Sequence, residues 1–325
     1  MERAFVTGVT GFAGSHLVES LLNDEVEVFG LVLPGSGHIP LPEHELFTAV
    51  EGDLTDGNAL EAAIGTVEPN VIYHLGGIAS PSLSWKQPAK TIAINAGGTA
   101  NILNAAQLAN KSRVVVVTSA LLYDSLEQDE LPITEESPPT PSHPYAVSKW
   151  TASLLVRLFW RRYSLPVVEA RPFNHIGPRQ ARGFVVPDFA SQLARIACGE
   201  LEPIVKVGNL EAQRDFTDVR DIVRAYRDLA RAGKPGETYL VCSGQPVSIK
   251  QLLETLIEIA GIQVKVVADP ERYRPLDTPV VYGSFDKIAK AIGWRPEISL
   301  KRSLEDAYDE WRERCNHGPE ERANR

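Results

Sequence analysis

The glycine-rich segment after the first apolar stretch is the feature that most limits how this chain can fold. Residues 4–7 are apolar and predict a short strand, the segment 8–14 follows it, and apolar residues at helical spacing in 17–22 predict a helix. Glycines between a first strand and a helix let backbone N–H groups approach a pyrophosphate at the positive end of the helix. We therefore expect an α/β fold built on a doubly wound parallel sheet of the Rossmann type. The residues expected at its cofactor are Gly8, Thr10, Gly11, Phe12, Ala13 and Gly14.

Size and composition narrow the class of protein. With 325 residues the chain has room for a large nucleotide-binding domain and a smaller companion. The net charge of -9 argues against a nucleic-acid surface, and no apolar run reaches the roughly 20 residues of a membrane span. Cys198, Cys242 and Cys315 are odd in number and fit no metal spacing, so we expect reduced thiols and no metal. A strand at residues 4–7 leaves no room for a secretion signal, and we expect a cytoplasmic protein.

The further strands expected in the sheet set out the rest of the cofactor site. They are residues 26–33, 71–75, 114–117 and 167–170. The second strand should end at the residue that contacts the adenosine ribose, where an acid suits NAD and a base suits NADP. This chain has Leu33 and Pro34 there, with Ser36 and His38 as the nearest polar residues, so the choice between NAD and NADP stays open.

Two segments after the second and third expected strands should also meet the cofactor. Asp53, with Leu54 beside it, is placed near the adenine end, although capping of the helix at 59–64 is an equally good interpretation. His74 ends a buried strand and is interpreted as a core histidine, whereas Leu75, Gly76 and Gly77 should let the dinucleotide cross the sheet edge. Asn95, on a helix expected over 91–109, should fix the strand that follows through a backbone hydrogen bond.

The reactive groups are expected at the pentapeptide 145–149 and at the end of the strand 114–117. Tyr145 and Lys149 are four residues apart, so on a helix they share one face. We expect the ammonium group of Lys149 to lower the pKa of the Tyr145 phenol, which makes Tyr145 an acid or base near neutral pH. Ser119 should reach the carboxyl edge of the sheet, where it can hydrogen-bond a sugar oxygen together with Tyr145.

These motifs together resemble the extended short-chain dehydrogenase/reductases that modify nucleotide sugars. The resemblance rests on Gly8 to Gly14, on Ser119 with Tyr123, and on Tyr145 to Lys149, in that order along the chain. It implies that the serine orients the sugar, that the tyrosine transfers the proton, and that the lysine holds the nicotinamide ribose. It also implies a homodimer in which helices 91–109 and 145–163 pack as a four-helix bundle.

The second half of the chain narrows the resemblance. The segments 173–178, 183–185 and 208–221 are similar to the GDP-4-keto-6-deoxy-D-mannose reductase branch of the family, whose product is GDP-D-rhamnose. Asn174 matches the family residue that contacts the sugar nucleotide. Guanidinium groups match phosphate geometry, and we expect some of the cations of this half to bind a diphosphate, Arg214 and Arg274 first among them. The full set of substrate candidates is Asn174, Arg179, Lys206, Arg214 and Arg274.

The chain departs from that branch at three places. Leu33 and Ile78 are apolar where the branch often has basic residues, and residues 120–122 are Ala-Leu-Leu where the branch usually has acids. A 4,6-dehydratase needs a carboxylate pair just after the hydroxyl residue, so elimination is disfavoured. We expect NAD(P)H-dependent reduction of the C4 keto group of a GDP-4-keto-6-deoxyhexose. The alternatives are an NAD-dependent NDP-sugar 4-epimerase and, less favoured, a dehydratase or a non-catalytic nucleotide-binding protein.

The expected domains alternate along the chain. Residues 1–172 and 214–245 should form the NAD(P)-binding Rossmann domain, with a helix over 223–231 and a late strand over 238–242. Residues 173–213 and 246–325 should form a smaller mixed α/β domain that binds the nucleotide sugar. In it, Ser248 and Gln251 predict a helix start and Gly261 its end. A strand over 264–267 and a helix over 285–291 are expected to follow.

Overall fold

A seven-stranded parallel sheet organises the larger part of the molecule. The structure is a computed structural model that describes residues 2–35, 39–109, 112–123, 130–272 and 278–316. The sheet order is β10-β6-β5-β4-β1-β2-β3, so the chain reverses direction across the sheet between β1 and β4. The glycine-rich segment follows β1 at this switch point, which is where open α/β sheets bind ligands. The strands are β1 (Arg3–Thr7), β2 (Glu27–Val32), β3 (Phe47–Glu51), β4 (Val71–His74), β5 (Arg113–Val117), β6 (Val167–Pro172) and β10 (Thr238–Val241).

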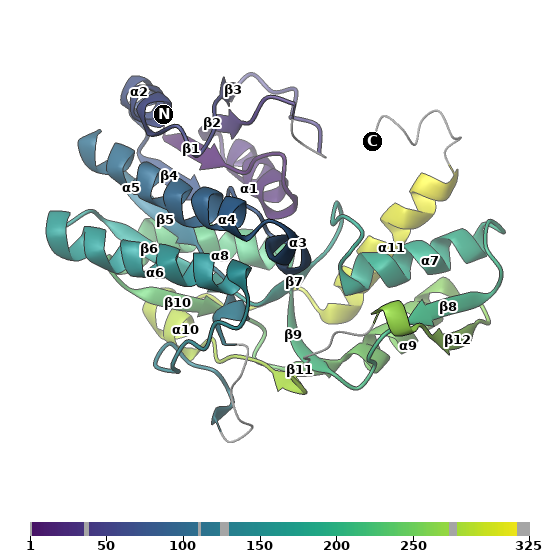
Figure 1. Cartoon of the computed structure of the whole chain (residues 1–325). Helices are drawn as coiled ribbons and strands as arrows, with labels where there is room; N and C mark the ends of the chain where they lie inside the picture. Colours follow the sequence, from purple (N-terminus) through teal and green to yellow (C-terminus); the bar gives the residue numbers. More distant parts are fainter. Residues whose placement is uncertain (1, 36–38, 110–111, 124–129, 273–277, 317–325) are drawn as a thin grey trace.

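Helices cover both faces of this sheet, which makes it doubly wound as predicted (Figure 1). One core layer joins the sheet to α1 (Phe12–Asn23), α8 (Val219–Ala232) and α10 (Asp286–Ile292). The other joins it to α2 (Gly57–Val67), α5 (Gly98–Leu108) and α6 (Pro144–Tyr163). Two short helices, α3 (Pro81–Lys86) and α4 (Pro88–Ile92), and a π-helical turn at Ala93–Gly97 lead into α5. Strands covered on both faces need continuous apolar runs, and Val114 to Val116 are fully buried as that requires.

The smaller part has its own sheets and its own core. Its strands β7 (Asn174–Ile176), β11 (Pro246–Ser248) and β13 (Val280–Val281) all pair around β9 (Gln213–Asp218). A separate pair is formed by β8 (Ile204–Val207) and β12 (Lys265–Ala268). The helices α7 (Val185–Ala197), α9 (Ile249–Ala260) and α11 (Leu300–Asn316) pack on one another through a shared apolar core and lie beside β8 and β12 in Figure 1.

The predicted elements are largely confirmed, although the helices α7 and α11, among others, were not predicted from the sequence. The strand β3 was not predicted, because an edge strand with only partly buried side chains shows little apolar pattern. The helix expected over 91–109 is interrupted by the π-helical turn at Ala93–Gly97. The segment expected as a loop after β6 contains the short strand β7. Ser248 accepts a hydrogen bond from the Gln251 amide, and Gly261 ends α9 in a left-handed conformation, both as predicted.

The domain boundaries remain a proposal of ours, and two elements bear on them. The strand β9 lies in the sheet of the smaller part, although most of it falls within the range expected for the Rossmann domain. The helix α10 falls within the range expected for the small domain but packs on β10 of the large sheet and on α8. Among the described residues, no helix is both long and apolar enough to cross a membrane.

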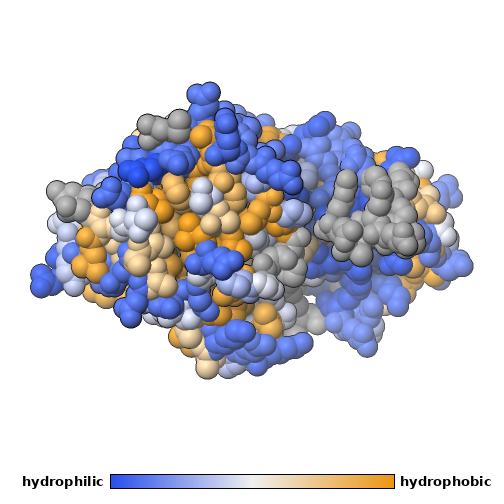
Figure 2. All heavy atoms as spheres, turned by 90° about the horizontal axis from the view of Figure 1, so that it is seen from above, coloured by the Kyte–Doolittle hydropathy of each residue, from blue (hydrophilic) through white to orange (hydrophobic). Residues whose placement is uncertain are grey.

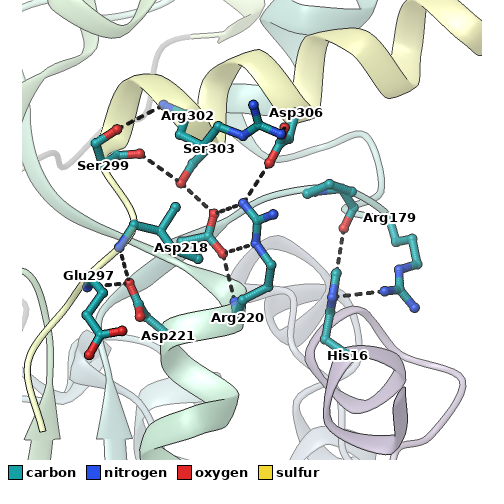
Figure 3. A network of polar contacts seen from close by, with 12 residues as sticks. His16, Arg179, Asp218, Arg220, Asp221, Glu297, Ser299, Arg302, Ser303 and Asp306 are labelled. Atoms are coloured by element: carbon teal, nitrogen blue, oxygen red, sulfur yellow. Dashed lines mark hydrogen bonds and ion pairs between the residues drawn. The ribbon is translucent and has the colours of Figure 1, made fainter. Parts of the chain in front are cut away.

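A polar network joins the two parts beside the start of α8 and α1 (Figure 3). Asp218 caps α8 by accepting from the Arg220 amide at 2.8 Å, and it accepts from the Ser303 hydroxyl of α11 at 2.6 Å. Arg220 also pairs with Asp306 of α11 at 2.7 Å. On α1, the His16 ring bonds the Pro178 carbonyl through Nε2 at 2.9 Å. The contacts of Asp218 and Arg220 hold α11 against the start of α8, and the contact of His16 holds the segment after β7 against α1.

Candidate active site

The glycine segment between β1 and α1 forms a tight turn that leaves no room for a side chain at Gly8 or Gly14. Gly8 has a φ of +79°, and a Cβ on Gly14 would lie 1.9 Å from the Gly8 carbonyl oxygen. Gly11 is the N-cap of α1 and provides no side-chain cap, so the first N–H groups of α1 have no side-chain acceptor there. An open helix N-terminus with backbone on all sides fits the pyrophosphate of a dinucleotide. The residues present therefore fit a nicotinamide dinucleotide.

The other residues predicted at the cofactor lie next to this turn. The Gly76 amide donates to the Thr7 hydroxyl at 2.8 Å, and a Cβ on Gly8 would meet the Gly76 nitrogen at 2.9 Å. Leu54 lies against Gly76, where an added Cβ would be 3.0 Å from its Cδ1. The structure thus brings the segments 53–54 and 75–77 to the glycine turn, and their contacts with a cofactor remain a prediction.

Asp53 does not cap the helix that follows it. Its carboxylate accepts from the Thr55 amide at 2.8 Å, whereas Asp56 caps α2 by accepting from the Ala59 amide at 3.0 Å. The capping interpretation of Asp53 is therefore wrong, because α2 begins at Gly57 and Asp56 occupies its N-cap position. The interpretation of His74 as a core histidine is confirmed. Its ring is buried and is hydrogen-bonded to the hydroxyl groups of Thr7 at 2.9 Å and Thr99 at 3.0 Å.

Ser119, Tyr145 and Lys149 come together at the carboxyl end of β5. Ser119 follows β5 and accepts from the Leu121 amide at 3.2 Å, and its hydroxyl is hydrogen-bonded to the Tyr145 phenol. Lys149 lies one turn further along α6 and donates from Nζ to the Val117 carbonyl at 3.0 Å. The exposed fractions of the three residues are 9%, 6% and 8%. A proton donor, a hydroxyl and a cation thus share one buried corner next to the switch point.

The expected lowering of the Tyr145 pKa is wrong. Burial raises the pKa of the phenol above its usual value of 10, and the hydrogen bond with Ser119 opposes that rise only in part. The Lys149 ammonium does not act on the phenol, because it turns to the Val117 carbonyl. Burial also lowers the pKa of Lys149 to about 8, against the attraction of Glu169. At neutral pH Tyr145 is a protonated phenol, which can act as an acid.

Asn95 acts on a different segment from the one predicted. Its side chain lies in the π-helical turn, accepts from the Ile78 amide at 2.8 Å and donates to the Ile78 carbonyl at 3.0 Å. It also donates to the Ser148 hydroxyl at 2.9 Å. Asn95 therefore fixes the loop after β4, the preceding strand, and ties it to α6 between Tyr145 and Lys149. The prediction failed because the position of Asn95 in the sequence does not reveal the π-helical turn, and this turn sets the direction of its side chain.

The candidate substrate residues lie on several elements of the small part. Asn174 on β7 donates to the Asp215 carbonyl of the adjacent strand β9 at 3.0 Å, and Arg214 on β9 donates to the Gln213 carbonyl at 2.7 Å. Lys206 is exposed on β8, which pairs with β12 and not with β9. Arg179 is bonded to His16 at 2.9 Å and pairs with Glu19, both on α1. Arg274 lies outside the described residues. The substrate contacts remain a prediction.

Sequence reasoning missed a buried ion pair beneath the site. Glu169 and Arg171 on β6 are 0% and 1% exposed and pair at 2.8 Å. Arg171 also donates to the phenol oxygen of Tyr123, which is buried beside it. The available signal was an acid between Val168 and Ala170, in the middle of a predicted strand.

Comparison with known proteins gives consistent matches over almost the whole chain. The model of a family described as GDP-mannose 4,6 dehydratase matches residues 5–307. A GDP-6-deoxy-D-mannose reductase of Pseudomonas aeruginosa is 35% identical over 317 residues, which cover 96% of this chain and 98% of that protein. The structure of RMD from Pseudomonas aeruginosa complexed with NADPH has a TM-score of 0.83 at 34% identity, covering 97% and 100% of the two chains. A UDP-glucose 4-epimerase from Thermotoga maritima with UDP-glucose has a TM-score of 0.87 at 26% identity, covering 96% and 99%.

Proposed function

The chain belongs to the GDP-mannose 4,6 dehydratase family, and from that premise we propose that it is an NAD(P)H-dependent reductase of a nucleotide sugar. The reaction is reduction of the C4 keto group of a GDP-4-keto-6-deoxyhexose, which gives GDP-D-rhamnose. The observation that carries the proposal is the buried Ser119–Tyr145 pair at the carboxyl end of β5, next to the glycine turn. The likeness to a GDP-6-deoxy-D-mannose reductase over 96% of the chain supports the choice of substrate.

Ser119, Tyr145 and Lys149 have separate roles in the proposed reduction of a ketone. A dinucleotide held at the glycine turn through its pyrophosphate would supply the hydride that C4 accepts. Ser119 hydrogen-bonds the C4 oxygen and orients it, and Tyr145 gives that oxygen its proton. Because burial keeps the phenol protonated at neutral pH, Tyr145 is in the form that a reduction requires. Lys149, whose ammonium group lies in the same corner, would hold the ribose of the nicotinamide.

The sequence after Ser119 argues against elimination of water. Residues Ala120–Leu122 form a 3₁₀ turn in which Ala120 and Leu122 are buried. A dehydratase needs a carboxylic acid close to C5 and C6 of the sugar, and this turn offers only apolar side chains. The chain is therefore a member of a dehydratase family without the acids of that reaction at this turn.

A 4-epimerase is the second candidate, because the structure matches that of a UDP-glucose 4-epimerase with a TM-score of 0.87. An epimerase first oxidises C4, and for that step the tyrosine must accept a proton. Burial raises the pKa of the phenol and keeps it protonated at neutral pH, so it is not in the form that accepts a proton, which favours the reductase.

The test is to incubate the protein with GDP-4-keto-6-deoxymannose and either NADPH or NADH, and to follow the absorbance of the reduced nicotinamide. We expect one cofactor oxidised for each sugar reduced, and the preferred cofactor is read from the same experiment. Conversion of a nucleotide sugar to its C4 epimer with no net change in cofactor would replace the proposal by the epimerase. The Tyr145→Phe variant is the control for reaction at this site.

We further propose a homodimer through a four-helix bundle made by α5 and α6 of two copies. The buried face of α6 includes Tyr145, Lys149 and Ser153, and the other face presents Val147, Leu154 and Leu158, which are 41%, 40% and 58% exposed. Their spacing places these three side chains on one stripe of the helix. Figure 2 shows apolar surface gathered over the larger part of the molecule on the face that it displays.

The surface of α6 makes the dimer testable. Leu154→Glu/Leu158→Glu should convert a dimer to a monomer in sedimentation velocity at micromolar concentration. Arg157→Glu, on the same helix between the two leucines, is the matched charge control and should stay dimeric. A wild-type protein that sediments as a monomer would reject the proposal.

A further inference from the structure

A carboxylate buried beneath the reactive corner is the strongest feature that the proposed chemistry does not use. Glu169 lies in the middle of β6 with no exposed surface. Removing a carboxylate from water costs several kcal/mol unless it is paired and hydrogen-bonded. Glu169 has both, since Arg171 donates to its Oε1 from Nη2 at 2.8 Å and from Nε at 3.1 Å. Burial alone would raise the pKa of Glu169, but Arg171 and three hydroxyl groups hold it below its usual value, so the group is ionised.

Three hydroxyl groups from three other elements end on this carboxylate. Thr118, at the end of β5, donates to Oε1 at 2.6 Å. Ser153 of α6 and Thr238 of β10 donate to Oε2 at 2.8 Å and 2.7 Å. Thr118 is the residue before Ser119, and Ser153 is one helical turn after Lys149. The carboxylate therefore ties the backbone that carries the hydroxyl to the helix that carries the phenol and the ammonium group.

Arg171 attaches β6 to the other end of the segment 119–123, at Tyr123. It donates from Nη1 to the phenol oxygen of Tyr123 and lies over that ring at 5.3 Å from its centre. It also donates from Nη2 to the Ser153 hydroxyl at 3.0 Å. The segment from Ser119 to Tyr123 is thus held at both ends by the Glu169–Arg171 pair.

The pair also sets the charge around Lys149. Glu169 is the carboxylate whose attraction opposes the loss of charge that burial imposes on Lys149. From β4, His74 faces the ammonium group, and burial, followed by the repulsion of that cation, lowers its pKa to about 3, so it is neutral. On α6 itself Tyr145 is a protonated phenol. Among the described residues that act on Lys149, Glu169 alone supplies negative charge.

We propose that Glu169, paired with Arg171, is a positioning residue of this site, which fixes Ser119 relative to Lys149 and supplies the negative charge that keeps Lys149 an ammonium ion. A purely structural role explains the arrangement less well, because apolar residues of similar volume stabilise a core as well as a buried ion pair does. The proposal rests on the role given to Lys149 in the proposed function.

Two variants distinguish the effect of the negative charge of Glu169 from the effect of its hydrogen bonds. Glu169→Gln keeps the shape and one acceptor oxygen but removes the charge. Glu169→Asp keeps the charge but is one methylene too short to reach all three hydroxyl groups. The Lys149 side chain is titrated directly by NMR in protein labelled with ¹³C-lysine, and its resonance is assigned by comparison with Lys149→Arg. This readout needs neither substrate nor cofactor, so its outcome is independent of the proposed function.

We expect the Lys149 titration midpoint, about 8 in the wild type, to fall by about one pH unit in Glu169→Gln. At pH 8 the charged fraction of Lys149 would then fall about fivefold, and kcat would fall by the same factor, while KM changes little. The loss of kcat should become smaller toward pH 6, where Lys149 is charged in both proteins. In Glu169→Asp the Lys149 midpoint should stay near 8, because the negative charge is kept. The fall in kcat should be the same at every pH, because the hydrogen bonds that position Ser119 and Lys149 are lost at every pH.

Wild-type titration of Lys149 together with wild-type kcat in folded Glu169→Gln would overturn the proposal. If that variant does not fold, Thr118→Val and Ser153→Ala each remove one hydrogen bond to the carboxylate and keep its charge. Each should lower kcat without moving the Lys149 midpoint, and kcat equal to the wild type in both would overturn the positioning role. Thr238→Val removes the bond from β10, which carries none of Ser119, Tyr145 and Lys149, and should lower kcat less than Thr118→Val or Ser153→Ala, with the midpoint unmoved.

Discussion

Replacing Asn95 by alanine tests how the loop after β4 is attached to the helix that carries Tyr145 and Lys149. Asn95 is 2% exposed and makes three hydrogen bonds, two with the backbone of Ile78 and one with the Ser148 hydroxyl. At about 1 kcal/mol for each hydrogen bond, Asn95→Ala should lower the free energy of unfolding by about 3 kcal/mol. Ser148→Ala removes only the third of these bonds, together with the bond from Ser148 to the Tyr145 carbonyl, and should cost about 1 to 2 kcal/mol.

The assay is urea unfolding of the wild type and the two variants at one pH, with the dependence on urea compared as well as the midpoint. Fluorescence titration with NADPH should also show weaker cofactor binding in Asn95→Ala, because Gly76 and Gly77 directly precede Ile78. If Asn95→Ala cost no more than Ser148→Ala, the attachment of Ile78 would not contribute to stability, and this reasoning would be refuted.

Three further predictions concern a core histidine, the proton donor and a helix cap. The pKa of His74 is about 3 in the fold against 6.5 ordinarily, so the stability that neutral His74 contributes is fully present above about pH 6.5 and is lost as the pH falls toward 3. Between pH 7 and pH 5 the loss in the free energy of unfolding is about 2 kcal/mol. In His74→Asn, urea unfolding should show a smaller fall in stability over this range. Tyr145→Phe should bind NADPH normally in a fluorescence titration but lose about 10²- to 10⁴-fold in kcat, and near-normal turnover would remove Tyr145 from the mechanism. Asp56→Ala removes the cap of α2 and should cost about 1 kcal/mol in urea unfolding with unchanged kcat, whereas unaltered stability would show that the cap contributes nothing.

The sequence predicts those parts of the fold that follow from local pattern. The glycine turn needs particular backbone conformations and close approach, as a Cβ on Gly14 only 1.9 Å from the Gly8 oxygen shows, so its residues identify it directly. The i, i+4 spacing of Tyr145 and Lys149 likewise places both on the buried face of α6. Central strands are recognised because burial on both faces demands apolar runs, which an edge strand such as β3 does not need.

The features that the sequence did not predict depend on contacts between distant segments. The Lys149 ammonium group turns to the Val117 carbonyl, and this contact exists only because β5 ends beside α6. The direction of the Tyr145 pKa depends on how completely the fold buries the phenol, which spacing along one helix does not reveal. Glu169 receives partners from four elements, and each of those partners is an ordinary residue in its own segment.

The most direct measurement follows hydrogen from the cofactor to the sugar. The protein is incubated with GDP-4-keto-6-deoxymannose and NADPH in which both hydrogens at C4 of the nicotinamide are deuterium, and the nucleotide-sugar product is analysed by NMR and mass spectrometry. Reduction by the Ser119–Tyr145–Lys149 site predicts one deuterium at C4 of the hexose in each product molecule, and formation of this product about 10²- to 10⁴-fold more slowly by Tyr145→Phe. A product without deuterium at C4, or equally fast formation of the labelled product by the Tyr145→Phe variant, would contradict the account.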